Sequence, residues 1–324
     1  MDSQEARIAW ASGGVKEGMA TMFKVLSLRR RRQLWAYLFI LVPLFFFLFI
    51  RIGPTLFSFN VSVRKWNILS PEKPFVGLEN FRKIWEDFQN PKSVVRHAFQ
   101  NTFAYVIVGM PAQLVIGLAL AMMLDRITRL ITLFRAVYFI PFVTSTVAIS
   151  WVWRWMYQPR FGPVNLFLRF LELPEQKFLL DPKQSLLSIM AVAIWQGLGF
   201  VIIIFLAGLK QIPDVYYEAA EIDGANRVQL FRHVTLPLLN PTIVYLAVLQ
   251  SISFLRMFTQ VINMSFQGMG GPLNSTVTVV LHMYHEGWRR YKMGSAAALM
   301  VVLFLIIMTA TLVQMRLLTR RVEY

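Results

Sequence analysis

The sequence predicts an all-α polytopic membrane protein with six transmembrane helices, on the strength of its composition, its long apolar windows and the charges beside them. Its 324 residues are 56% hydrophobic and 15% charged, whereas an ordinary soluble domain carries about 25% charged residues. A soluble fold of this length cannot hide so much apolar surface and also keep a polar shell, but lipid can cover it. The composition therefore excludes a disordered chain and argues against a soluble enzyme.

Apolar windows long enough to cross the hydrocarbon core as helix, about 20 residues each, recur along the chain. The first window is interrupted by Arg51, which must snorkel or face protein or water. The other windows carry no charge or almost none. In chain order, the predicted spans are residues 34–59, 98–124, 136–153, 184–209, 233–256 and 293–315.

Positive charges beside the first and last spans predict the orientation. The chain has 33 Lys and Arg against 17 Asp and Glu. These charges flank apolar windows without forming a continuous basic face, so we expect a lipid membrane and no nucleic acid as a partner. Arginines fill positions 29–32 before the first span, and three more lie within residues 316–321. Because such charges favour the cytoplasmic side, residues 1–33 and 319–324 are expected to be cytoplasmic tails.

The segment between the fourth and fifth spans has the signals of two short helices joined by a tight turn. Pro213 suits the first turn of a helix. Gly224 suits the position just after a helix, where φ is positive. A second short helix is expected over 225–234, with Pro237 at the entry to the fifth span. We therefore predict a helix–turn–helix over 213–237 at the membrane surface; a capped connector without further role is the alternative.

This segment resembles the EAA loop of binding-protein-dependent ABC importer permeases. The matching positions are Glu218, Ala219, Ala220, Asp223, Gly224, Ala225, Phe231 and Pro237. In that family the loop is the coupling helix, which docks on a separate ATP-binding subunit. The resemblance thus implies that these residues couple the chain to an ATPase.

Three further segments are similar to the carbohydrate branch of the family, of the maltose- and glycerol-phosphate-permease kind. They are 75–81, 161–165 and 270–272. The resemblance covers about residues 34–318, the expected transmembrane permease domain, with an ABC core at about 97–317. It implies the type I ABC importer fold in the cell inner membrane.

The resemblance also implies a function and partners. The chain would form the membrane path for a sugar or related polyol. Its partners would be a second homologous permease, a dimer of ATP-binding subunits and an external solute-binding protein. ATP and Mg would be used by the ATPase, so no cofactor is expected on this chain.

Polar residues inside the apolar windows are candidates for that path, because each is costly in lipid. Ser253, Arg256, Gln260 and Asn263 are spaced three, four and three residues apart, which predicts one face of a helix. Their hydroxyl, guanidinium and amide groups suit sugar hydroxyls. Hydrogen bonding between helices, or an arginine that snorkels, is an equally open interpretation. Gln196 in the fourth span is a further candidate, although a structural role is favoured for it.

The sequence has no motif for bond chemistry. It contains no G-x-x-x-x-G-K-[ST] phosphate loop, no nucleophile elbow and no cysteine. His282 and His285 stand beside Glu286, but the remaining ligands of a metal site are missing. We therefore expect no catalytic, cofactor or metal residue, and a non-catalytic subunit. A self-sufficient secondary transporter or channel is the alternative, and it would favour inverted repeats or charged relays within the spans.

Overall fold

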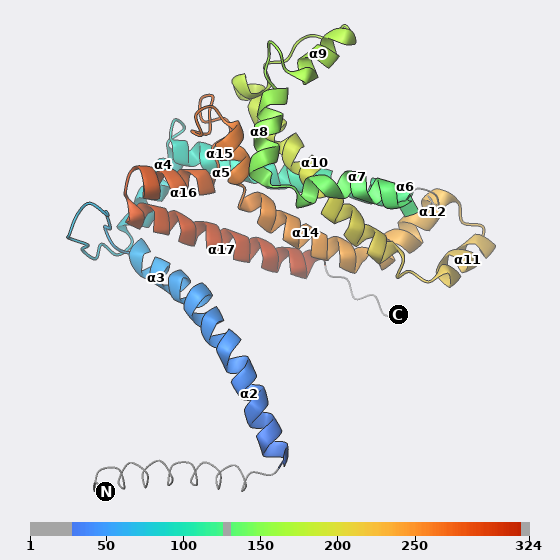
Figure 1. Cartoon of the computed structure of the whole chain (residues 1–324), viewed down its shortest axis with the longest axis horizontal. Helices are drawn as coiled ribbons and strands as arrows, with labels where there is room; N and C mark the ends of the chain where they lie inside the picture. Colours follow the sequence, from blue (N-terminus) through green and yellow to red (C-terminus); the bar gives the residue numbers. More distant parts are fainter. Residues whose placement is uncertain (1–27, 126–130, 319–324) are drawn as a thin grey trace, which may run out of the picture. The chain divides into compact units, whose positions relative to one another are not determined.

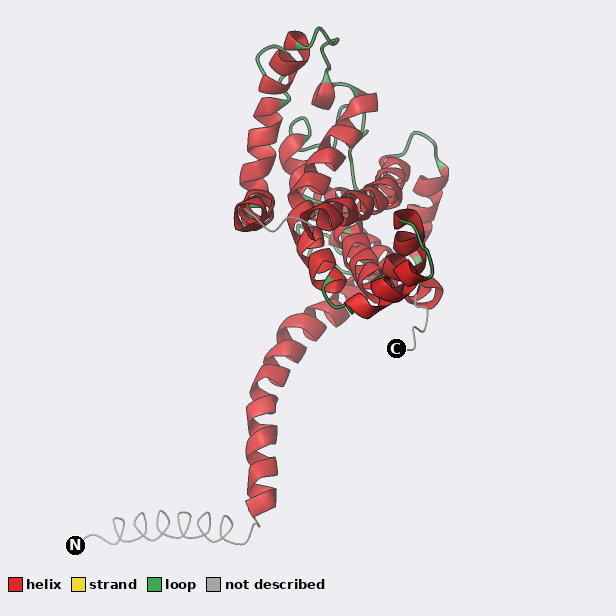
Figure 2. Cartoon of the chain, turned by 90° about the vertical axis from the view of Figure 1, so that its right-hand side faces the viewer, coloured by secondary structure: helices red, strands yellow, loops and turns green. Residues whose placement is uncertain are grey.

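The computed structural model describes residues 28–125 and 131–318, which fold into helices joined by loops, as Figure 2 shows. Residues 1–27 and 319–324 of the predicted tails lie outside these ranges. The α-helices are α2 (Leu28–Phe47), α3 (Gly53–Ser62), α4 (Glu79–Gln89), α5 (Val94–Ala104), α6 (Met110–Asp125), α7 (Ile131–Val143), α8 (Thr146–Met156), α9 (Pro163–Phe170), α10 (Pro182–Leu209), α11 (Asp214–Ile222), α12 (Arg227–Leu230), α13 (Leu236–Leu238), α14 (Asn240–Leu255), α15 (Thr259–Met264), α16 (Val279–Tyr284) and α17 (Met293–Leu318). Short π-helical turns are η1 (Leu48–Ile52), η2 (Tyr105–Gly109), η4 (Phe231–Thr235) and η5 (His285–Arg289), and η3 (Phe178–Leu180) is a 3-10 helix.

Four helical runs in the described ranges are long and apolar enough to cross a membrane. They are Arg30–Ser62, Val94–Asp125, Pro182–Leu209 and Met293–Leu318, with 33, 32, 28 and 26 residues. Two bent helix pairs complete six spans if each pair counts as one span. The predicted all-helical membrane fold is therefore confirmed, with four to six spans.

The third predicted span, 136–153, is not one straight helix. Its residues belong to the pair Ala136–Val143 and Thr146–Met156, which is bent by 106°. Pro141 lies inside α7, where it cannot donate a backbone hydrogen bond. Ser145, just before α8, is extended at φ −53° and ψ 124°. The chain therefore turns sharply between α7 and α8, and the expectation of a continuous helix is wrong.

The fifth predicted span, 233–256, is bent as well. Arg227–Leu238 meets Asn240–Leu255 at 66°. Pro241 lies in the first turn of α14, where the missing N–H has no helical partner to lose. The apolar helix of this pair therefore begins after the expected entry at Pro237, which lies within α13.

The chain divides into two compact units, Met1–Asn60 and Val61–Tyr324. In the second unit α10 packs against α6 and α7, and α14 lies beside α17 (Figure 1). A Cβ added to Gly199 of α10 would lie 2.4 Å from the carbonyl oxygen of Tyr138 in α7. The absence of a side chain at Gly199 thus lets the backbones of these two helices touch.

Two clusters of buried apolar side chains form the core of the second unit. One includes Tyr105, Met190 and Phe254, and the other includes Ile202 and Leu246. In lipid such contacts stabilise the bundle by close van der Waals packing, because lipid tails are as apolar as the side chains. Both clusters contain residues of α10 and α14, so these helices are held against the same neighbours.

Candidate functional site

The helix that carries the predicted polar stripe ends within the stripe. Helix α14 stops at Leu255, and the chain turns at Phe258, where φ is −140° and ψ is −55°. The Thr278 hydroxyl donates to the Met257 carbonyl oxygen at 2.8 Å, so one backbone group released by the break is paired. The next helix, α15, begins only at Thr259. The prediction that 253, 256, 260 and 263 share one helical face is therefore wrong.

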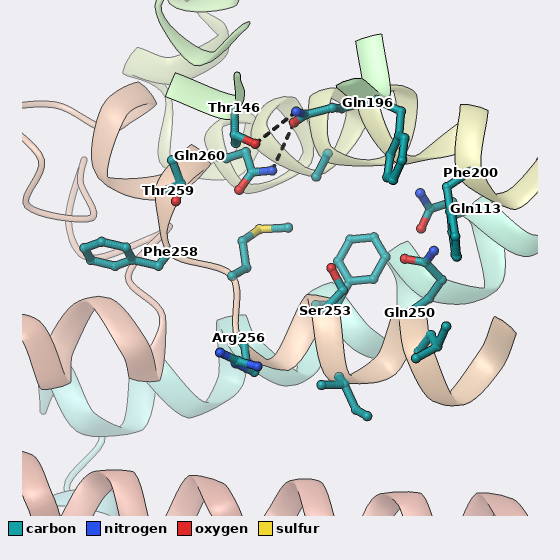
Figure 3. Close-up of a pocket in the computed structure, with 17 residues that line it drawn as sticks. Gln113, Thr146, Gln196, Phe200, Gln250, Ser253, Arg256, Phe258, Thr259 and Gln260 are labelled. Carbon is teal, nitrogen blue, oxygen red and sulfur yellow. Dashed lines mark hydrogen bonds between the residues drawn. The ribbon is translucent and has the colours of Figure 1, made fainter. Parts of the chain in front are cut away.

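The break nevertheless brings polar residues together. A cavity of about 580 Å³ lies there, lined by residues of α6, α7, α8, α10, α14, α15 and the break at 256–258 (Figure 3). Its polar lining residues are Gln113, Thr146, Gln196, Gln250, Ser253, Arg256, Thr259 and Gln260. No acidic residue belongs to the lining among the described residues. The cavity is therefore rich in amides and hydroxyls and carries one positive charge.

A chain of side-chain hydrogen bonds crosses one side of this cavity. The Gln260 amide Nε2 donates to Gln196 Oε1 at 3.2 Å, and Gln196 Nε2 donates to Thr146 Oγ1 at 3.0 Å, as the dashed lines in Figure 3 show. These bonds link α15, α10 and α8. Gln196 and Gln260 therefore both line the cavity and hold helices together, which joins two roles that the sequence left as alternatives.

Other polar groups of the lining remain unused. Within the described ranges, the side chains of Gln250, Ser253 and Arg256 have no hydrogen bond or ion pair, and the last two are exposed. Gln113 donates to the Ile194 carbonyl oxygen at 3.3 Å, while its own buried Oε1 accepts no bond there. These donors and acceptors are available to a polar ligand.

Sequence reasoning missed Gln113 and Gln250, although each lies in an apolar window and a buried amide is costly there. It also included Asn263, which the structure does not bring to the cavity lining. The side-chain Nδ2 of Asn263 donates to the backbone carbonyl oxygen of Thr259 at 2.7 Å. The backbone carbonyl oxygen of Asn263 accepts from the Arg154 side chain at 3.2 Å. Asn263 is thus engaged in packing beside the cavity.

The helix–turn–helix segment is present over 213–237. Gly224 follows α11 with φ +82°, as its position predicted. Pro213 precedes α11 as its cap, one residue earlier than expected. The second helix begins at Arg227, two residues later than expected, because Asn226 caps it: its Oδ1 accepts from the backbone N–H groups of Val228 and Gln229 at 3.1 and 3.0 Å.

The residues of the predicted coupling set lie mostly at the surface. Glu218, Ala219, Asp223, Gly224 and Pro237 are exposed, and Ala220, Ala225 and Phe231 are half-buried.

Apolar side chains accompany this set on the same segment. Val215, Ile222 and Val228 are 62%, 87% and 72% exposed. The hydroxyls of Tyr217 and Thr235 lie 3.1 Å apart and join α11 to the π-helical turn η4. Exposed apolar side chains on helical segments that are joined by a hydrogen bond are typical of a protein-docking site. The coupling role itself stays a prediction.

No group of three or more His, Asp or Glu side chains is arranged to hold a metal ion within the residues that the structure covers. His285 Nε2 contacts the Gly268 carbonyl oxygen at 3.1 Å, and Glu286 pairs with Arg290 at 2.6 Å. Of the cluster noted in the sequence, His285 and Glu286 are thus already engaged in contacts within the protein.

Comparison with known proteins decides the family. The family model described as binding-protein-dependent transport system inner membrane component matches residues 90–324. The chain belongs to this family. The arabinooligosaccharides transport system permease protein of Halalkalibacterium halodurans is 32% identical to this permease over 271 residues, 83% of each chain. The trehalose/maltose transport system permease protein of Thermococcus litoralis is 29% identical over 293 residues, 90% of this permease and 95% of that protein.

A solved structure supports the same fold. A chain of the bacterial alginate ABC transporter in complex with an alginate pentasaccharide-bound periplasmic protein matches with a TM-score of 0.74 at 21% identity. The match covers 88% of this permease and 94% of that chain. The predicted type I importer fold and the resemblance to ABC permeases are confirmed. The chain is a multi-pass inner-membrane permease of an ABC transporter, which sets aside the self-sufficient transporter or channel.

The hydrogen-bond chain in the cavity predicts a difference between two glutamines. Gln196→Leu removes the acceptor of Gln260 and the donor to Thr146, so the free energy of unfolding should fall by about 1 kcal/mol. Gln250→Leu, which loses no protein hydrogen bond among the described residues, is the matched control. Thermal unfolding of the purified permease complex measures both, and equal melting temperatures would contradict the structural role of Gln196.

Proposed function

We propose that this permease forms the membrane path for a sugar or related polyol, and that the amide-lined cavity is part of that path. The observation that carries the proposal is the set of unused polar groups around about 580 Å³ of space. Amides and hydroxyls both donate and accept hydrogen bonds, as sugar hydroxyls do. The volume lies in the range of ordinary small-molecule sites. Two relatives named for trehalose/maltose and for arabinooligosaccharide transport favour the same substrate class.

The proposed complex contains this permease, a second homologous permease, a dimer of ATP-binding subunits and an external solute-binding protein. The exposed side chains of Ser253 and Arg256 leave the cavity open on one side. A second permease facing that side would complete the wall. ATP and Mg would be bound and used by the ATP-binding subunits alone. This subunit would form the substrate path and transmit the movement, and it would catalyse no reaction.

The lever is proposed to be the segment 213–237 together with α14. Its exposed apolar side chains would dock on the ATP-binding subunit. The Tyr217–Thr235 contact joins α11 to the turn that leads into α13 and α14. Ser253 lies near the C-terminal end of α14, at the cavity. A displacement of the docked segment would therefore move the cavity wall through this one helix.

The orientation follows from this docking. A segment that meets an ATPase lies in the cytoplasm, and six spans then put both termini there as well. The arginines at 29–32 favour the same side. Reporter fusions at residues 1 and 324 read the orientation directly, and an external C-terminus would contradict it.

Arg256 provides the test of the pathway. In proteoliposomes with the whole transporter, Arg256→Met should lower uptake about tenfold, because one charge-assisted hydrogen bond to substrate contributes about 1.5 kcal/mol or more. The yield of assembled complex should not change, since Arg256 is exposed and has no partner within the described residues. Arg154→Met is the contrasting variant: Arg154 bonds to Asn263 and stacks on Trp151, so it should lower yield. Unchanged uptake and selectivity in Arg256→Met would contradict a pathway role.

Gly224 provides the test of coupling. A Cβ at Gly224 would meet no atom within 4 Å, so only its φ of +82° restricts substitution. Gly224→Val should be strained by about 1–3 kcal/mol and uncouple ATP hydrolysis from substrate. Gly224→Asn, which tolerates positive φ, should retain most of the coupling. Substrate-stimulated ATPase activity of the reconstituted complex measures both variants, and full stimulation with Val would refute the assignment.

A further inference from the structure

A second cavity, of about 500 Å³, lies apart from the first, at the start of the membrane-crossing helix α17. It is lined by residues of α4, α5, α16, η5, α17 and the loops at 65–67 and 290–292. Backbone pairing builds its wall: Gly294 N donates to the Trp66 carbonyl oxygen at 3.0 Å, and Asn67 and Lys292 form an antiparallel bridge. A Cβ on Gly294 would lie close to the carbonyl oxygen of Arg64, so glycine permits this contact.

Two helix N-termini meet at this cavity. Ser93, the N-cap of α5, and Val94, its first residue, are in the lining. Gly294 and Ser295, in the first turn of α17, are in the lining as well. The N-terminal end of a helix carries partial positive charge and attracts anions. Helices of 11 and 26 residues therefore direct the same sign of potential toward one space.

Cationic side chains add to this potential. Lys65, Lys83, Arg290 and Lys292 line the cavity together with two carboxylates, Asp87 and Glu286. Glu286 is bound by Arg290 at 2.6 Å, and Lys83 is bound to a glutamate outside the lining. Lys65 and Lys292 are exposed, and their ammonium groups make no hydrogen bond or ion pair within the described residues. An anion in the cavity would meet both.

One buried polar side chain in the lining also lacks a hydrogen-bond partner within the described residues. His282 is only 6% exposed, and its ring makes no hydrogen bond within the described residues. Burial lowers the pKa of His282 below its usual value, which favours the neutral ring with one N–H donor. Its ring nitrogens are not among the fully buried unpaired atoms, so they are open to a ligand or water in the cavity.

We propose that this cavity binds the phosphate group of a phosphoester. Several donors converge on it from different elements, and a phosphate offers three or more acceptor oxygens. The space far exceeds that of a bare ion, since one water accounts for about 30 Å³, and so it accommodates the organic part of an ester. Because the cavity lies at one end of the Met293–Leu318 span, the phosphate can belong to a lipid headgroup or to a soluble phosphoester.

The test uses the complete transporter complex and the double variant Lys65→Gln/Lys292→Gln. Both lysines are exposed, so the variant should fold, which its melting temperature without ligand checks. Lys92→Gln is the matched control, because Lys92 is exposed near the start of α5 but does not line the cavity. Binding of glycerol phosphate to delipidated complex is measured at constant ionic strength, and phospholipid retained by complex from phosphatidylglycerol nanodiscs is counted by native mass spectrometry.

Wild type and Lys92→Gln should bind at least one of these probes, and the double variant should bind it at least about tenfold more weakly. Glycerol phosphate binding identifies a soluble ligand, whereas retained lipid alone identifies a headgroup site. Absence of both in wild type, or equal binding in the double variant, would overturn the proposal. Saturable binding of an acidic peptide without either probe would overturn it too, in favour of a protein-docking site.

Discussion

A polar group in the hydrocarbon region is costly unless protein or water pairs with it, and the break after Leu255 brings several of this chain's polar groups to one place. The break ends α14, pairs the Met257 carbonyl with Thr278 and lets Gln260 reach Gln196. Polar side chains that would line one face of a straight helix instead surround one cavity together with polar groups of neighbouring helices. The helices around it can remain apolar on their other faces.

The surroundings of the cavity fix its shape. Helix α10 supplies Gln196 on one side and packs closely on α7 through Gly199 on another. Helix α14 connects the surface segment 213–237 with the cavity. In the proposed mechanism, a displacement of that segment would move the wall formed by α14, while α10 stays packed against α6 and α7.

The sequence predicted what depends on local chemistry. Charge-free windows located the spans, because transfer to lipid depends on composition. Gly224 predicted the turn after α11, because positive φ is a property of one residue.

Contacts between distant residues escaped prediction. The break before α15 follows from contacts such as Thr278 with Met257, which are distant in sequence, and it contains neither Pro nor Gly. The predicted stripe therefore included Asn263, whereas Gln113 and Gln250 were omitted although their amides in apolar windows are visible in the sequence.

Single-cysteine labelling tests the broken helix most directly, since the chain has no native cysteine. Variants with one cysteine each at 253, 256 or 263 would be treated, in the assembled transporter, with a membrane-impermeant thiol reagent. A cavity at the break predicts fast labelling at 253 and 256 and protection at 263, where Asn263 is hydrogen-bonded outside the lining. Equal labelling at all three positions would indicate a continuous polar helical face, and protection at all three would show that no water-filled cavity exists there.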